Sequence, residues 1–128
     1  MRLLTLAEVL IIAEAVTGID ADILIKVSRI ELLESAIAAS EAGFGEHDLY
    51  PDFYDKAAVL CSRIVGNHAL PDGNKRLGWQ TLVLFCDLNE YELIVDTDEA
   101  VEFIQSLAAG EVSEPQLAEW IRSHVKRR

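Results

Sequence analysis

The nine residues His68-Ala69-Leu70-Pro71-Asp72-Gly73-Asn74-Lys75-Arg76 divide the chain into two helical parts. A helix through the middle of this run is disfavoured, because proline lacks a backbone N–H donor and glycine loses more entropy than other residues on ordering. Apolar residues with a helical period lie on both sides of the run. The sequence therefore predicts one helix that ends near His68 and another that begins near Asn74.

The same run concentrates polar chemistry in one loop. A histidine ordinarily titrates near neutral pH, so His68 is a candidate general base. Asp72 offers a carboxylate of the kind that holds magnesium beside phosphate oxygens. Lys75 and Arg76 place two cations at the positive end of the next helix, which is unfavourable unless an anion binds there. The run therefore predicts a site for a nucleotide phosphate with a base beside it.

Most residues of the run also have a simpler structural explanation. His68 could simply lie at the C-terminus of a helix, where its positively charged form is favoured. The tripeptide Pro71-Asp72-Gly73 forms a turn by itself, and Asn74 could cap the next helix, orient a phosphate, or do both. Gly73 permits a positive φ and a close approach of phosphate. Together these explanations leave the two cations unexplained in a chain whose formal net charge is -11.

Length and composition limit the classes of protein to which the chain can belong. The chain has 128 residues, 51% of them hydrophobic, which suffices for one domain with its own core. We expect residues 1–128 to form a single all-α domain of about six helices. Cys61 and Cys86 lie in apolar segments, which predicts buried, reduced thiols. The acidic balance argues against broad contact with nucleic acid, and the absence of a signal or membrane-spanning pattern favours the cytoplasm.

Caps and breakers indicate where the other elements begin and end. Thr5-Leu6-Ala7-Glu8 and Ser28-Arg29-Ile30-Glu31 have the pattern of capping boxes, and Ser113-Glu114-Pro115-Gln116 has the pattern of an N-terminal cap. Residues 42–50 predict a loop or a short hairpin, and residues 91–95 a short extended piece. The segment 74–88 is apolar on most faces, which predicts a central helix. The expected helices span about residues 5–16, 28–40, 51–67, 74–88, 96–110 and 113–126.

The run from His68 to Arg76 resembles the signature of the Fic/Doc superfamily, H-x-F-x-[D/E]-[G/A]-N-[G/K]-R. It departs from that signature only at Leu70, where leucine keeps the hydrophobic character of phenylalanine with less volume. The resemblance is to Doc-like (death-on-curing) toxins of toxin–antitoxin modules, and it extends from about Leu4 to Arg122. Besides the signature, it is carried by Gly43-Phe44-Gly45, by Tyr50-Pro51 and by Ala109-Gly110-Glu111-Val112-Ser113.

The resemblance implies a role for each polar residue of the loop. His68 would take the proton from the attacking hydroxyl of a target protein, and Asp72 would bind Mg²⁺. A hairpin at residues 43–50 would act as a flap that holds the target segment by main-chain pairing. The flap contacts would come from Phe44, His47 and Leu49. The phosphates of ATP would be bound by Gly73, Asn74, Lys75 and Arg76.

Two positions separate the activities within the superfamily. Adenylylating members generally carry glycine at the position of Lys75, and many carry a second arginine at the position of Trp79. Doc-like members resemble this chain at both positions. The resemblance therefore implies a kinase that transfers the γ-phosphate of ATP to a threonine of elongation factor Tu and inhibits translation. The alternatives are a Fic-type adenylyl or other nucleotidyl transferase and a catalytically silent helical binding module.

The sequence also bears on regulation. Many Fic proteins are silenced by a motif of the form S/T-x-x-x-E-[G/N], but no glutamate of this chain is followed by glycine or asparagine. The resemblance then implies that the inhibitor is a separate, Phd-like antitoxin. The acidic charge of the chain suits a basic partner.

Overall fold

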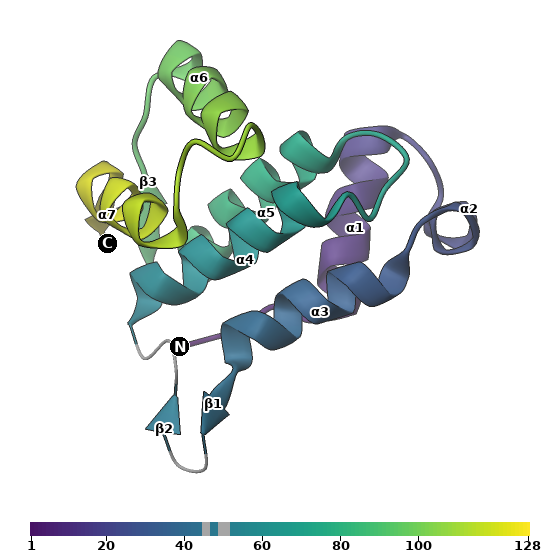
Figure 1. The fold of residues 1–128 in the computed structure, drawn as a ribbon, viewed down its shortest axis with the longest axis horizontal. Helices are drawn as coiled ribbons and strands as arrows, with labels where there is room; N and C mark the ends of the chain where they lie inside the picture. The colour runs from purple at the N-terminus through teal and green to yellow at the C-terminus, as the bar shows by residue number, and fades with distance from the viewer. Residues whose placement is uncertain (45–46, 49–51) are drawn as a thin grey trace.

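The computed structural model describes residues 1–44, 47–48 and 52–128, and helices dominate this part of the chain (Figure 1). Its helices are α1 (Leu6–Thr17), α2 (Ala21–Val27), α3 (Ile30–Glu41), α4 (Phe53–Asn67), α5 (Asn74–Leu88), α6 (Thr97–Ala108) and α7 (Glu114–His124). Two short antiparallel pairs accompany them, β1 (Gly43–Phe44) with β2 (His47–Asp48) and β3 (Tyr91–Leu93) with β4 (Val125–Arg127). The predicted all-α class is confirmed, and of the loop or short hairpin that the sequence allows at residues 42–50, the described residues form the hairpin.

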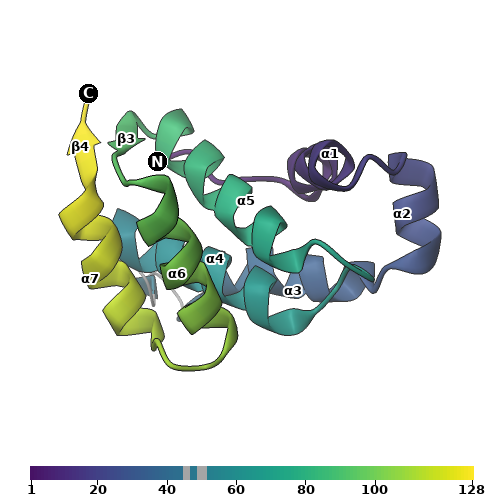
Figure 2. The ribbon, with the colours of Figure 1, turned by 90° about the horizontal axis from the view of Figure 1, so that it is seen from above.

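The two helices that flank the loop run, α4 and α5, form the centre of the molecule. Figure 2 shows α1, α2 and α3 on one side of them and α6 and α7 on the other. The interface between α4 and α5 is apolar, and its fully buried side chains include Leu60, Cys61, Ile64, Val65, Leu77, Leu82 and Phe85. Burying one aliphatic or aromatic side chain stabilises a fold by about 1.5–3 kcal/mol. Because this interface holds α4 and α5 together, it fixes both ends of the loop that joins them.

Gly78 brings the two central helices unusually close together. A Cβ atom at this position would lie 2.4 Å from Cγ2 of Val65 and 3.4 Å from the carbonyl oxygen of Cys61. The first distance is well inside the van der Waals contact of two carbon atoms, which is about 3.5–4.0 Å. The absence of a side chain at Gly78 is therefore what allows α5 to pack against α4 one turn after the loop.

The predicted caps of the first and last helices are confirmed. Thr5 and Glu8 form a reciprocal capping box at the start of α1, and Gly18 ends that helix in a left-handed conformation. Ser113 and Gln116 form a second box at the start of α7. The N-cap of α4 is Asp52, whose carboxylate accepts a hydrogen bond from the N–H of Tyr54 at 2.6 Å.

The prediction of a capping box at Ser28 is wrong. Ser28 closes α2, and its N–H donates to the carbonyl of Leu24 at 2.9 Å. The next helix, α3, begins at Ile30 and has no side-chain cap. The N–H of Arg29 is instead bonded to the carbonyl of Ala69, at 2.8 Å, in the loop between α4 and α5. A distant contact thus replaces the local cap, and the seven-residue helix α2 raises the number of described helices from the expected six to seven.

The end of the chain also differs from the prediction. The last helix was expected to run to about residue 126, but α7 ends at His124 and the basic residues continue as β4. The pairing of β4 with β3 satisfies main-chain groups that a helix end leaves open. The N–H of Ile94 donates to His124, at 2.7 Å, and the N–H of Arg128 donates to Glu90, at 2.9 Å. The predicted extended piece after α5 is confirmed as β3.

Both cysteines are buried, as predicted, and burial raises the pKa of Cys61 and of Cys86 to about 12. The two thiols are therefore protonated at neutral pH. In the described part of the chain, no helix combines the length and the apolar character that crossing a membrane requires.

We expect Gly78→Ala to lower the free energy of unfolding by about 1–3 kcal/mol, because the new methyl group overlaps Val65 and forces α4 and α5 apart. Gly66→Ala is the matched control, since Gly66 lies in α4 and a Cβ there meets no atom within 4 Å. That change should raise stability, by up to about 1 kcal/mol, through helix propensity. Urea denaturation followed by circular dichroism measures both. Equal effects of the two substitutions would contradict the close approach.

Candidate active site in the loop between α4 and α5

The loop of residues 68–73 is held between two residues with positive φ. His68 ends α4 in a left-handed conformation with φ 52° and ψ 47°. Gly73, with φ 90°, is the N-cap of α5. Between them, Ala69 and Leu70 are each only 3% exposed and anchor the loop in the core. Leu70 thus occupies the apolar position that phenylalanine takes in the superfamily signature, and the polar residues around it remain at the surface.

The side chain of Asn74 forms hydrogen bonds across the loop to the main chain of Leu70. Its Oδ1 accepts a hydrogen bond from the N–H of Leu70, at 3.0 Å, and its Nδ2 donates to the carbonyl of the same residue, at 2.9 Å. Of the two roles that the sequence leaves open for Asn74, the structure does not show the capping of α5, because the cap is Gly73 and Asn74 is the first helical residue. The side-chain amide satisfies two main-chain groups that the loop cannot pair with its own backbone.

A second set of contacts joins the loop to the start of α3. The guanidinium of Arg29 donates from Nη2 to the carbonyl of His68, at 3.2 Å, and the N–H of Arg29 donates to Ala69. Nδ2 of Asn67 donates to the carbonyl of Leu32, also at 3.2 Å. Sequence reasoning missed these residues as parts of the site. The only signal was indirect, since Arg29 lies inside the box pattern that the structure does not use for capping.

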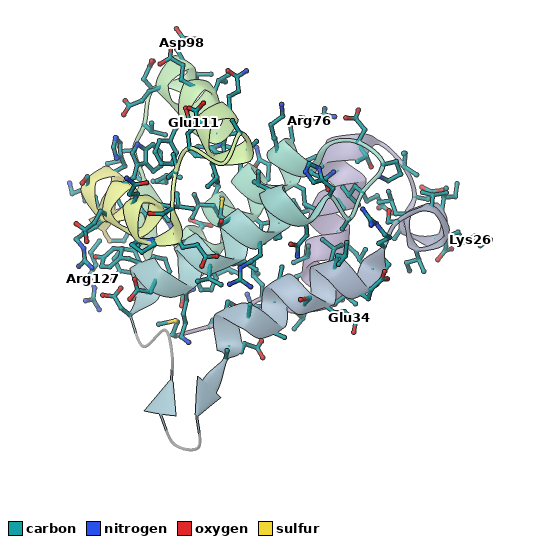
Figure 3. The ribbon with its side chains drawn as sticks, in the orientation of Figure 1. Lys26, Glu34, Arg76, Asp98, Glu111 and Arg127 are labelled. Carbon is teal, nitrogen blue, oxygen red and sulfur yellow. The ribbon has the colours of Figure 1, made fainter. Side chains whose placement is uncertain are left out.

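The two cations of the loop run have no carboxylate partner among the described residues. Lys75 and Arg76 are both exposed in the first turn of α5, and Figure 3 shows Arg76 at this end of the helix, near α1. Nη2 of Arg76 lies 3.5 Å from where a Cβ of Gly73 would be. An anion at the N-terminus of α5 would therefore meet both the helix dipole and two unneutralised side chains.

The same cations line a cavity of about 610 Å³. Apolar residues from α1, α5, β3 and α6 make up most of its wall, and Lys75 and Arg76 lie at its border with the loop. His68 and Asp72 are not among the lining residues. The apolar wall includes Val16, Trp79, Val83, Leu93, Val95, Val101 and Ile104.

Trp79 follows the two cations one turn along α5. Its ring packs edge-on against Trp120 of α7, with 6.2 Å between the ring centroids and 65° between the planes. Trp120 in turn stacks on Phe103 of α6 at 4.2 Å. Trp79 is therefore a packing residue that joins α5 to α7, and it contributes no charge to the wall of the cavity.

Asp72 is the one carboxylate of the loop, and its exposed side chain has no ion-pair partner in the described part of the chain. No group of three or more His, Cys, Asp or Glu residues with the arrangement of a metal site occurs among the described residues. A single free carboxylate fits Mg²⁺, because this ion is often held by one or two carboxylates together with phosphate oxygens and water.

The predicted flap residues fall partly outside the described residues. Phe44 and His47 are paired in register across β1 and β2, which begin directly after α3. Leu49 lies outside the described residues. The hairpin is thus at the end of α3, while the loop run contacts the start of the same helix. The roles assigned to the three flap residues stay predictions, as do those of His68, Asp72 and the phosphate-binding residues.

The fold and this loop define a helical protein that presents an exposed histidine and a carboxylate in the loop between its two central helices, and two cations at the start of the second. Residues 4–86 match the sequence model of the Fic/DOC family, and this chain belongs to that family. The predicted resemblance is thereby confirmed. The chain is also 40% identical over 74 residues to Toxin Doc of Mycolicibacterium smegmatis (strain ATCC 700084 / mc(2)155). The alignment covers 58% of this chain and 57% of that toxin, so it spans little more than half of either protein.

We expect Asn74→Ala to lower the free energy of unfolding by about 1–3 kcal/mol, because it leaves the N–H and the carbonyl of Leu70 unpaired in a partly buried loop. Gln80→Ala is the control, since Gln80 is an exposed residue of the same helix whose side chain makes no hydrogen bond among the described residues. Chemical denaturation of the two variants measures the difference. If the two substitutions changed stability equally, the closing role of Asn74 would be refuted.

Proposed function

We propose that this chain is a Doc-like toxin that transfers the γ-phosphate of ATP to a hydroxyl group of a target protein. The observation that carries the proposal is the pair of unneutralised cations, Lys75 and Arg76, in the first turn of α5, which follows the loop that begins at the exposed His68. Such a helix start favours a multiply charged phosphate. Membership in the Fic/DOC family and the similarity to a protein named Toxin Doc support the same assignment.

Each residue of the loop has a part in the proposed reaction. The hydroxyl oxygen of the target attacks the γ-phosphorus, the bond to the bridging β–γ oxygen breaks, and ADP leaves. His68 accepts the proton of the hydroxyl. Lys75 and Arg76 neutralise phosphate charge. The main-chain N–H groups of Gly73 and Asn74 lie at the N-terminus of α5, beside the same two side chains. Positioning and charge stabilisation supply most of the catalysis in phosphoryl transfer.

Magnesium is the expected companion of ATP at this site. Asp72 would hold the ion, which when bound would neutralise part of the charge of the phosphate groups. The free carboxylate on the exposed loop is what supports this assignment.

Two observations favour a kinase over an adenylyl or other nucleotidyl transferase. Lys75 adds volume and charge where a glycine would leave space for phosphates. Trp79, at the position of the second arginine of many adenylylating members, is packed against Trp120. Phosphate binding is thus concentrated at Lys75 and Arg76, which suits a different orientation of the nucleotide. A silent binding module is disfavoured because it has no need for a base, a carboxylate and two free cations in one loop.

The proposed partners follow from the family. The target is a threonine of elongation factor Tu, whose modification would inhibit translation, and the hairpin of β1 and β2 would hold the target segment by strand addition. The proposed inhibitor is a Phd-like antitoxin. Such a toxin would act in the cytoplasm, where ATP and the translation machinery are found.

The transferred group distinguishes the alternatives directly. The protein is incubated with purified elongation factor Tu and with ATP labelled at either the γ- or the α-phosphate. We expect label on the target only from the γ-phosphate, measured by gel autoradiography. His68→Asn should abolish the transfer, because asparagine tolerates the left-handed conformation of this residue but cannot act as a base. Label from the α-phosphate would indicate nucleotidyl transfer, and label from neither would favour a binding module.

Magnesium dependence tests the role of Asp72. Titration calorimetry with ATP, with and without Mg²⁺, measures affinity independently of activity. We expect Mg²⁺ to strengthen ATP binding to the wild-type chain by about tenfold or more and to have little effect on Asp72→Ala, which lacks the carboxylate that holds the ion. Asp22→Asn serves as the control, since Asp22 is an exposed carboxylate of α2 without a partner among the described residues. Unchanged magnesium dependence in Asp72→Ala would refute its role.

A further inference from the structure

We propose that Arg29 is a positioning residue, which sets the orientation of the base His68 from the start of α3. The proposal rests on the proposed function, because it concerns the same loop. It adds a residue that lies outside the loop run, 39 positions before His68 in the sequence.

The first step of the argument is the conformation of His68. It is one of the two described residues other than glycine that have a positive φ, at 52°. A side chain in this region is disfavoured by contact between Cβ and the backbone, and such conformations persist where the surroundings fix them. Since the direction of Cα–Cβ follows from φ and ψ, whatever fixes this backbone also fixes where the imidazole is presented.

The second step is the source of the constraint. Arg29 makes two separate hydrogen bonds to this backbone, one from its guanidinium to the carbonyl of His68 at 3.2 Å and one from its N–H to the carbonyl of Ala69 at 2.8 Å. These are consecutive carbonyl groups at the end of α4, which the helix itself leaves unpaired. Arg29, the residue that precedes α3, therefore holds both peptide groups that follow the Cα atom of His68 along the chain.

The third step is that the neighbouring positions are also held. Asn67, before His68, is tied to the carbonyl of Leu32, and Leu70 is tied to Asn74. Four consecutive residues, 67–70, are thus connected to other parts of the structure. At His68 itself the contact comes from the Arg29 guanidinium, which has no carboxylate partner among the described residues.

The proposed role depends on the donors of the Arg29 guanidinium, one of which bonds to the carbonyl of His68. Methionine keeps most of the length of the side chain and removes every donor, so Arg29→Met deletes the bond to the His68 carbonyl together with the positive charge. The bond from the N–H of residue 29 to Ala69 is a main-chain bond and remains in the variant. Arg29→Lys retains one donor group and should recover part of the effect.

The test combines activity with a structural measurement. For Arg29→Met we expect kcat of phosphate transfer to fall by about tenfold while KM for ATP changes less than about twofold, since the base is misplaced but the phosphate site is intact. The backbone chemical shifts of His68, which report a left-handed conformation, should move toward ordinary values. Arg29→Lys should give intermediate results. Lys26→Met is the matched control, because it removes an exposed cation of α2 that has no partner among the described residues.

Three results would overturn the proposal. They are unchanged His68 shifts in Arg29→Met, an equal loss of kcat in Lys26→Met, or a rise in KM for ATP that accounts for the whole loss of activity. If the wild-type chain transfers no phosphate at all, the proposed function fails, and the chemical shifts alone then decide the role of Arg29. Shifts that move in Arg29→Met but not in Lys26→Met would still support it.

Discussion

The close approach of α5 to α4 at Gly78 is the constraint on which the rest of the structure depends. A methyl group there would lie 2.4 Å from Cγ2 of Val65, so the two helices can meet at this distance only with glycine at this position. The loop run joins the ends of these two helices, and its shape therefore depends on their separation. Leu70 can reach the core, and Asn74 can reach back to Leu70, because α4 and α5 are held together immediately behind the loop.

This arrangement separates the apolar and polar halves of one short segment. Ala69 and Leu70 are buried, whereas His68, Asp72 and the two cations are at the surface. The buried pair and the tethers from Arg29, Asn67 and Asn74 fix the backbone, and the exposed side chains are then presented in a defined order. For the proposed transfer of phosphate, a loop held in this way would need little rearrangement, because positioned charge is the main protein contribution to phosphoryl transfer.

Sequence reasoning predicted the parts of the fold that have local causes. Helix α5 was predicted with its observed bounds, because a glycine precedes it and an apolar pattern with a helical period follows. The errors have distant causes. Arg29 bonds to Ala69, which moves the start of α3, and β3 pairs with the end of the chain, which shortens α7. The loop residues were found by their chemistry, but the contact of Arg29 with His68 joins segments 39 residues apart and has no local signature.

Lys75 and Trp79, the two positions on which the proposed choice between kinase and nucleotidyl transferase rests, have different physical roles in this chain. Lys75 is exposed and borders the cavity, so replacing it changes mainly charge and volume at the start of α5. Trp79 belongs to an aromatic column that continues through Trp120 to Phe103 and joins α5, α7 and α6. An arginine at that position would lose the ring contact with Trp120 and so weaken the packing of α5 against α7. A substitution at Trp79 therefore affects the stability of the fold, whereas a substitution at Lys75 changes the surface without removing a packing contact of this kind.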